Sequence, residues 1–215
     1  MFESLNVGSA VHKMTVLHDI INDCQLDLIV LQETRITEDS PLAIKLDIAP
    51  DDYSVLYVHR DSAMSTGNSR GGGLAVIFRN SVVVHQHSLP NAVTLTSFEF
   101  QLVRVGFKHS SSILINIYHS PSSSLATFYD ELSDLISIVG SGITDCIVLC
   151  DNFSCPGVND SHTDKELEIV LDTFNLTQHI SSPTHGDSLL DIIVCEDATS
   201  TWNIRLDEAG LISYY

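Results

Sequence analysis

Polar side chains stand at the ends of several apolar runs, where buried strands are expected to end. Asp151 and Asn152 follow the run "IVLC", and Glu33 ends the segment "LIVLQE". Tyr118 ends "ILINIY", and Asp191 lies inside "LLDIIV". Asp and Asn also favour turns, because they hydrogen-bond to their own backbone. Two interpretations therefore compete, namely ordinary turn signals or a site at the carboxyl ends of sheet strands.

Taken together, these residues favour a metal-dependent site. In an α/β sheet, strand ends on one side converge on one crevice, where ligands usually bind. Carboxylates such as Glu33 and Asp151 would repel one another there unless a hard cation neutralised them, and Mg²⁺ prefers carboxylate oxygens. Asn6 and Tyr118 add polar groups without adding negative charge.

Each residue alone also has a plain structural interpretation. Glu33 is consistent with the start of a loop, and the Asp151 carboxylate with a turn. Asp191 lies between two apolar residues, so strand alternation allows it to face solvent. Tyr118 is compatible with a half-buried strand position. Asn6 is compatible with a helix cap, although a cap falls more naturally at Ser9. Only the set and its order favour the site.

The elements that must position these residues follow from the hydrophobic pattern. Helical spacing predicts helices over 11–24, within 120–139 and over 164–174. Apolar runs predict strands at 26–31, 73–78, 113–118, 146–150 and 189–194, and partial alternation predicts a strand or strand pair at 93–105. Some strands are separated by helices and others are joined directly. This mixture predicts layered α/β architecture with mixed sheets.

Composition narrows the class of protein. The chain has 215 residues, 44% of them hydrophobic, with no internal repeat and no long linker, so we expect a single domain over 1–215. The glycines at 71–73 precede a strand and therefore do not form a nucleotide loop, which must lead from a strand into a helix. No run is long enough to span a bilayer and no secretory signal is evident. We expect an intracellular protein, nuclear or cytoplasmic, that is not secreted and has no membrane partner.

The net charge of −18 argues against a large electrostatic footprint on nucleic acid. It does not exclude a nuclease, because a bound divalent cation locally reverses the sign of an acidic site.

At this point the chain resembles the endonuclease/exonuclease/phosphatase superfamily and, more narrowly, the endonuclease domain of non-LTR (LINE-type) retrotransposons. The resemblance covers nearly the whole chain, and its pieces come in the family's order: "SLNVGSAVHK", "LDLIVLQET", "RGGGLAVIFRNS", "SFEFQLVRV", "NIYHSP", "IVLCDNFSCPG" and "PTHGDSLLDIIV". It implies a four-layer α/β sandwich, two mixed sheets with helices outside. It also implies phosphodiester or phosphomonoester hydrolysis with Mg²⁺ or Mn²⁺. The retrotransposon branch nicks DNA and, in an intact element, is joined to a reverse transcriptase domain of the same polyprotein.

The resemblance also implies roles for individual residues. Glu33 matches the metal-binding glutamate, and Asn6 matches the amide near the metal and phosphate. Tyr118 matches the tyrosine that contacts the scissile phosphate. Asp151 matches the aspartate that orients or deprotonates the attacking water beside the metal. Asp191 resembles the carboxylate that supports the catalytic histidine.

One departure from the family lies in the strand that ends at Asp151. The family places its amide two residues after this aspartate, whereas here Asn152 follows directly and Phe153 comes next. Because strand side chains alternate, we expect Asn152, the matching phosphate-binding amide, to point away from the site.

A second departure lies at the end of the chain. The family closes with Ser-Asp-His and a final strand, but here Ser213 is followed by Tyr214 and Tyr215. We therefore expect a chain truncated at its carboxyl end that lacks the last strand. The remaining candidates for a base, His119, His179 and His185, are expected to be surface or loop histidines.

Three hypotheses follow. The first is a degenerate retrotransposon endonuclease domain, whose metal-dependent DNA cleavage is weak or absent. The second is a non-catalytic remnant that keeps the fold as a binding module. The third is a phosphatase acting on a small phosphoester.

Overall fold

The computed structural model describes residues 1–60, 71–89, 93–106, 111–120, 124–141, 146–152, 165–180 and 191–196, and for residues 151 and 152 it describes the backbone alone. The elements in chain order are β1 (Phe2–Asn6), the 3₁₀ turn η1 (Ala10–His12), α1 (Met14–Asp23), β2 (Leu28–Gln32), α2 (Leu42–Asp47), β3 (Tyr53–Val58), β4 (Leu74–Arg79), β5 (Val83–His87), β6 (Phe98–Gly106), β7 (Ser111–His119), α3 (Leu125–Gly140), β8 (Cys146–Asn152), α4 (Lys165–Thr173), β9 (Leu176–Gln178) and β10 (Asp191–Glu196).

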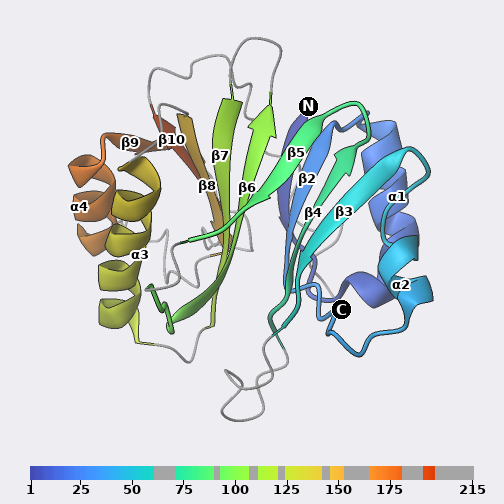
Figure 1. Ribbon diagram of the computed structural model, residues 1–215, viewed down its shortest axis with the longest axis horizontal. Helices are drawn as coiled ribbons and strands as arrows, with labels where there is room; N and C mark the ends of the chain where they lie inside the picture. Colours follow the sequence, from blue (N-terminus) through green and yellow to red (C-terminus); the bar gives the residue numbers. More distant parts are fainter. Residues whose placement is uncertain are drawn as a thin grey trace.

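Two mixed sheets pack face to face. The four-stranded sheet has the order β1-β2-β4-β3, and the six-stranded sheet has the order β5-β6-β7-β8-β10-β9. β1 and β2 are parallel, as are β7 and β8, and the other pairs are antiparallel. Helices α1 and α2 cover the outer face of the first sheet, and α3 and α4 cover that of the second (Figure 1). The expected four-layer α/β sandwich with mixed sheets is therefore confirmed.

Three apolar cores hold the four layers together, one at each interface between neighbouring layers. Leu17 and Ile21 of α1 are buried against the first sheet. Helices α3 and α4 bury apolar residues against the second sheet, with Phe128 at 0% exposure. Val30 and Val148 lie in the core between the sheets. Strands buried on both faces read as continuous apolar runs, which explains why β2, β7 and β8 were predicted from the sequence.

Other elements differ from the prediction. The segment expected as a strand or strand pair over 93–105 is one strand, β6, which pairs with β7 along its whole length. The helix expected over 11–24 is divided into η1 and α1. Strands β1, β3, β5 and β9 and helix α2 were not predicted. The expected absence of a final strand concerns residues after Glu196, which lie outside the described residues.

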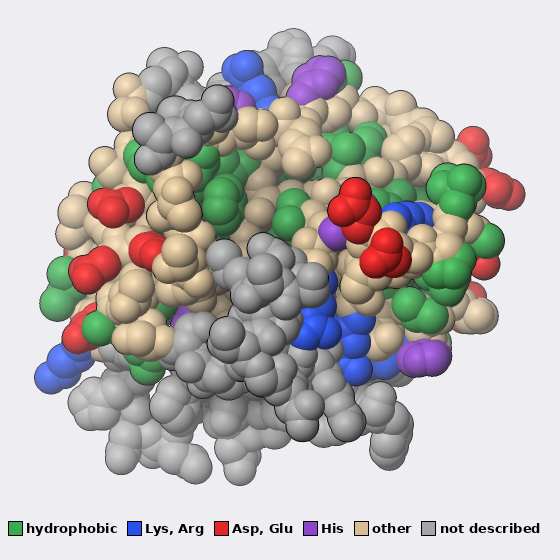
Figure 2. Space-filling model, turned by 60° about the horizontal axis from the view of Figure 1, so that its bottom comes forward, with side chains coloured by type: hydrophobic (Ala, Val, Ile, Leu, Met, Phe, Trp, Pro, Cys, Tyr) green, Lys and Arg blue, Asp and Glu red, His purple; other side chains and the backbone are tan. Residues whose placement is uncertain are grey.

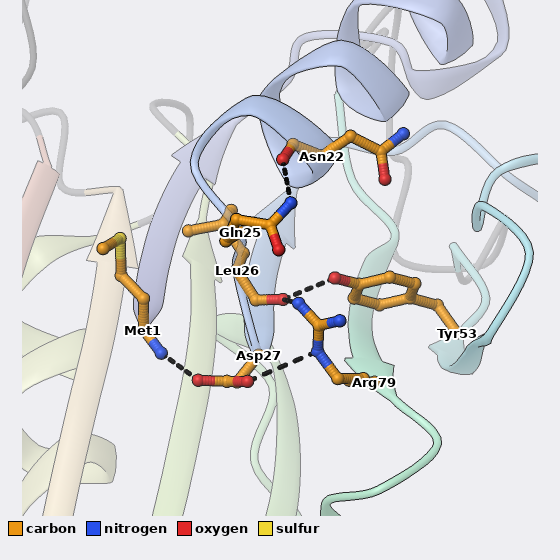
Figure 3. Close-up of polar contacts among 7 residues, drawn as sticks. All are labelled: Met1, Asn22, Gln25, Leu26, Asp27, Tyr53 and Arg79. Carbon is orange, nitrogen blue, oxygen red and sulfur yellow. Dashed lines mark hydrogen bonds and ion pairs between the residues drawn. The ribbon is translucent and has the colours of Figure 1, made fainter.

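The loop that leads into β2 is fixed by a group of polar contacts (Figure 3). The carbonyl oxygen of Leu26 accepts hydrogen bonds from Tyr53 Oη at 2.6 Å and from Arg79 Nη2 at 3.2 Å. The Asp27 carboxylate pairs with Arg79 Nε at 3.4 Å and with the amino group of Met1. These contacts join the start of β2 to β3, β4 and the start of β1.

Among the described residues, no helix combines the length and hydrophobicity that a membrane crossing requires.

Candidate active site

Three of the predicted site residues meet at one end of the sandwich. Asn6 ends β1, Glu33 follows β2 directly, and Tyr118 lies near the end of β7 in the other sheet. Asn6 Nδ2 donates a hydrogen bond of 3.0 Å to Glu33 Oε1, while Asn6 Oδ1 accepts one of 3.0 Å from the Gly8 amide. A Cβ atom added to Gly71 would lie 2.0 Å from Tyr118 Oη and 3.1 Å from Glu33 Oε2. The Tyr118 hydroxyl and the Glu33 carboxylate therefore both lie close to the same point, beside Gly71.

A glycine segment (residues 71–73) crosses this point, and it was not predicted as part of the site. The amide of Thr34 donates to Gly73 O and that of Arg35 to Gly72 O, each at 3.0 Å. The Gly73 amide donates to Glu99 Oε2 at 2.5 Å. Gly72 and Gly73 have φ of +99° and +83°, values that glycine adopts without strain. The glycines thus let the backbone approach side chains for which a Cβ atom leaves no room.

Glu33 and Arg35 occupy strained backbone conformations beside this segment. Their φ values are +54° and +56°, in the left-handed region that non-glycine residues seldom adopt. The pairing of residues 34 and 35 with the glycine segment holds this conformation. Backbone strain of this kind concentrates at functional sites, where the surrounding structure enforces it.

Tyr118 is held in its neutral form. Burial raises the pKa of its hydroxyl far above the usual range, and the carboxylates of Glu33 and Glu99 raise it further. Arg35 and Arg60 lower this pKa by a smaller amount. A neutral phenol keeps its proton, so Tyr118 can donate a hydrogen bond to an anionic group at neutral pH.

Basic side chains also lie beside Glu33. Arg35 Nη2 is 3.8 Å from Glu33 Oε2. Lys13 Nζ donates a hydrogen bond of 2.8 Å to Val7 O. Burial lowers the pKa of Lys13, Arg35 lowers it further, and Glu33 acts in the opposite direction. The site therefore contains cations as well as carboxylates, which sequence reasoning did not predict.

A buried polar network lies next to the site, between the two sheets. Gln32 Nε2 donates to Asn116 Oδ1 at 2.8 Å and to Ser4 Oγ at 3.1 Å. Asn116 Nδ2 donates to Leu31 O at 3.2 Å and to Gln101 Oε1 at 3.3 Å. Gln32, Asn116 and Gln101 are each at most 1% exposed. Directional bonds therefore join β2 to β6 and β7, directly beneath Glu33 and Tyr118.

The strand register gives the backbone positions of the remaining predicted residues. Asn152 of β8 is the partner of Tyr118 on one side and of Asp191 on the other. Asp151 is the partner of Ile117, which is buried in the core beneath α3. Residues paired across neighbouring strands share one face of a sheet. In the backbone register, Asn152 therefore takes the position beside Tyr118, and Asp151 takes the position beside Ile117.

The three histidines considered as alternative bases differ in position. His119 is not a surface residue, because it is 2% exposed and its ring lies 4.5 Å from that of Phe128. Its strand partner Phe98 belongs to the helix-side core, so His119 is on the face opposite Tyr118. His179 lies just after β9, where its Nε2 is 3.0 Å from Cys195 Sγ. His185 and the segment around Ser213 lie outside the described residues.

Sequence reasoning missed Lys13, Arg35, Glu99 and the glycine segment for a shared reason. Their place in the site depends on contacts between distant segments, such as the register that sets Glu99 beside Tyr118. The one available signal was the run of three glycines, which often marks a close approach of backbone to another group.

The oxygen donors at the site suit a hard divalent cation. Magnesium is usually bound through one or two carboxylates, with waters and substrate phosphates completing the octahedron. Glu33 provides a carboxylate next to the amide of Asn6. The described side chains contain no group of three or more His, Cys, Asp or Glu arranged to hold a metal ion. Glu33 is therefore compatible with a site that water and phosphate complete.

Comparison with known proteins agrees with this architecture. No curated protein matches the sequence. Among solved structures, the endonuclease domain of TRAS1, a telomere-specific non-LTR retrotransposon, superposes with a TM-score of 0.69 at 11% identity, covering 98% of this chain and 91% of that domain. The human Nocturnin catalytic domain has a TM-score of 0.60 at 15% identity, with coverage of 90% and 80%. AP endonuclease LMAP from Leishmania major has a TM-score of 0.60 at 11% identity, with coverage of 93% and 79%.

At these identities the structural matches show the fold alone. The sequence model of the Endonuclease/Exonuclease/phosphatase family, however, matches residues 4–149, which include Asn6, Glu33 and Tyr118. The chain belongs to the endonuclease/exonuclease/phosphatase family.

Proposed function

We propose that this chain is a divalent-metal-dependent phosphodiesterase that nicks DNA, of the kind found in non-LTR retrotransposons. The observation that carries the proposal is the convergence of the Asn6 amide, the Glu33 carboxylate and the Tyr118 hydroxyl between the ends of two sheets. Enzymes of this family are in general divalent-metal dependent. The likeness in fold to a retrotransposon endonuclease domain supports DNA as the substrate. In an intact element, the proposed partner is a reverse transcriptase domain of the same polyprotein.

In this proposal, Glu33 is a ligand of Mg²⁺ or Mn²⁺, which when bound would act as a Lewis acid on phosphate oxygens. Asn6 and Tyr118 donate hydrogen bonds to oxygens of the scissile phosphate, where negative charge increases during the reaction. A phenol is protonated at neutral pH even with its usual pKa, and burial moves the pKa of Tyr118 still further from neutral. Donors fixed before the substrate arrives stabilise the transition state without reorganisation.

The residues at the end of β8 carry the proposal of weak activity. By resemblance, Asp151 would orient or deprotonate the attacking water, Asp191 would support the base and Asn152 would contact the phosphate, which needs Asp151 on the face of Tyr118. The register, however, gives Asn152 the position beside Tyr118. An amide cannot take a proton from water, whereas a carboxylate can. We therefore expect slow cleavage, and we expect the exchange Asn152→Asp to speed it.

A plasmid-nicking assay tests the proposal. Supercoiled plasmid is incubated with the 215-residue chain and Mg²⁺ or Mn²⁺, and relaxed circles are counted over time. Glu33→Ala is the test variant. Glu38→Ala is the matched control, because Glu38 lies in the same loop, is exposed, and carries the same charge. Circular dichroism establishes that each variant is folded.

The proposal predicts metal-dependent nicking that is lost in Glu33→Ala and kept in Glu38→Ala. Equal nicking by both variants would refute the assignment of Glu33. A folded chain that never nicks DNA would favour the non-catalytic module, and phosphate release from small esters without nicking would favour the phosphatase. Nicking at the rate of an intact homologue, with no gain in Asn152→Asp, would refute the expected impairment.

A further inference from the structure

Two histidines lie two residues apart on β5, outside the candidate active site. β5 stands at the edge of the six-stranded sheet and pairs with β6 alone among the described strands. His85 and His87 are both exposed. Histidine side chains reach the surface at several separate places (Figure 2), so exposure alone does not mark a site. The spacing distinguishes this pair, because no other two of the 10 histidines in the sequence stand two residues apart.

The two histidines share one face of the sheet. Side chains alternate along a strand, so residues 85 and 87 are on the same face and Gln86 is on the other. The partner of His87 on β6 is Leu102, which is buried in the helix-side core. The pair is therefore on the outer face of the sheet, opposite the face that carries Tyr118.

The strand also fixes the distance between the two side chains. Each residue of an antiparallel strand advances about 3.4 Å, so the Cβ atoms of His85 and His87 are roughly 7 Å apart. Two imidazoles at this spacing can reach one ion, because a bound metal lies about 2.0–2.1 Å from a histidine nitrogen. Every residue from Val83 to His87 has a partner on β6, so the spacing is set before an ion arrives.

Neither ring is engaged by another part of the described structure. No other described residue makes a hydrogen bond or ion pair with His85 or His87. The charged residue opposite His85 is Arg104 of β6. Arg104 Nη2 donates to Ser111 Oγ of β7 at 3.2 Å, on the side of β6 away from β5. Arg104 is exposed, so solvent and salt screen its charge and it weakens cation binding only modestly.

The ligand chemistry selects the kind of ion. Imidazole nitrogen suits Zn²⁺, Cu²⁺ and Ni²⁺, whereas Mg²⁺ prefers oxygen ligands. We propose that His85 and His87 together bind one divalent transition-metal ion of this kind, such as Zn²⁺, with water in the remaining coordination positions. This site differs in its ligands from the oxygen-lined candidate active site around Glu33, and it does not depend on the proposed function. The described side chains offer no third His, Cys, Asp or Glu to complete a larger ligand group, so the site is a two-histidine chelate.

Calorimetric titration of the 215-residue chain with Zn²⁺ tests the proposal. A large excess of Mg²⁺ is present throughout, so that oxygen-lined sites are already occupied. His85→Gln and His87→Gln each remove one ligand. The matched control, Gln86→His combined with His87→Gln, keeps two histidines on β5 but moves them to opposite faces of the sheet. Circular dichroism establishes that each variant is folded.

The wild-type chain should bind Zn²⁺ in the presence of excess Mg²⁺. Loss of either histidine should weaken this binding about 100-fold, the lower end of the gain that comes from linking two ligands. The variant with relocated histidines should lose as much affinity as the single variants. An affinity equal to wild type in the relocated variant would overturn the proposal, as would a wild-type chain that binds no Zn²⁺ under these conditions.

Two further variants exclude zinc binding elsewhere on the chain. His12→Gln removes an exposed histidine that has no other histidine two residues away. His179→Gln removes a histidine whose Nε2 lies 3.0 Å from Cys195 Sγ, a nitrogen and sulfur pair that could also hold Zn²⁺. Each should change the Kd by less than about twofold. Loss of the Zn²⁺ binding in His179→Gln, with none in His85→Gln, would assign the ion to that pair and overturn the proposal.

Discussion

Glu131 of α3 joins its helix to the segment that precedes β6, and its removal should be costly. Glu131 Oε2 accepts hydrogen bonds from Thr96 N at 2.9 Å, Ser97 N at 2.8 Å and Ser97 Oγ at 2.6 Å. Glu131 Oε1 accepts one from Thr96 Oγ1 at 2.9 Å. Burial raises the pKa of this carboxyl group, but the bonds from Ser97 and Thr96 outweigh it and leave the pKa below its usual value.

The contacts set the size of the expected effect. A hydrogen bond to a charged group contributes about 1.5–3 kcal/mol when buried, but here the bonds to Thr96 are exposed and all four share one carboxylate. Glu131→Ala should therefore lower the free energy of unfolding by about 2–4 kcal/mol. Glu131→Gln keeps an oxygen for the three donors at Oε2 and loses the charge, so we expect about 1 kcal/mol.

The stabilisation that Glu131 contributes should weaken as pH falls. The folded-state pKa of Glu131 is below its reference value of 4.5, so its stabilisation is present above that value and is lost as pH falls through the folded-state pKa. The difference between wild type and Glu131→Gln should be largest at about pH 7 and should shrink below about pH 4.5. Urea unfolding followed by circular dichroism measures both free energies.

A matched substitution controls for the loss of a surface charge. Asp134→Ala removes an exposed carboxylate from the same helix and should change the free energy of unfolding by less than about 0.5 kcal/mol. A pH-independent difference for Glu131→Gln would refute the reasoning. An equal effect of Glu131→Ala and Asp134→Ala would refute it as well.

Three further changes test other parts of the structure. Gly71→Ala should reduce nicking about 100-fold without unfolding the chain, because Tyr118 Oη would have to move by roughly 1 Å. Gly140→Ala is its control, since the nearest atom to the added carbon is 3.9 Å away, and equal activities would contradict the prediction. Asn116→Leu should lower the free energy of unfolding, measured with urea, by about 2–4 kcal/mol, because it leaves buried polar partners unpaired. An unchanged free energy of unfolding would show that the network contributes nothing. His119→Phe should become more stable relative to wild type as pH falls below 6.5. Burial lowers the pKa of the His119 imidazole, and neither ring nitrogen has a partner among the described residues, so protonation favours the unfolded wild type. Parallel pH profiles of the two proteins would count against this.

The sequence predicted the parts of the fold that depend on local pattern. Strands β2, β7 and β8 are long apolar runs, and α3 and α4 show clear helical spacing. The missed strands lack such a signal, because β1 is only partly buried throughout, β5 is mostly exposed and β9 has three residues. Their strand structure depends on neighbours in the sheet rather than on their own pattern.

For the site, the sequence predicted residue types at strand ends but not their mutual geometry. Asn6 and Glu33 come together because β1 and β2 are parallel and end at the same level, with Asn6 opposite Gln32. The position of Asn152 could not be predicted in the same way. It depends on the phase in which β8 pairs with β7, and one residue of register exchanges the two faces. The chemical roles of Asn6, Glu33 and Asp151 remain predictions.

The buried amides between the sheets have a consequence for how accurately the site can be built. Two apolar sheet faces attract each other with little preference among small sliding displacements, because the hydrophobic effect is not directional. Amide hydrogen bonds tolerate errors of only a few tenths of an ångström, so Gln32, Asn116 and Gln101 select one offset of the sheets. The alignment of site residues that come from different sheets then depends on these buried side chains. Substitutions at these three positions would misalign the site even if every residue facing the substrate were kept.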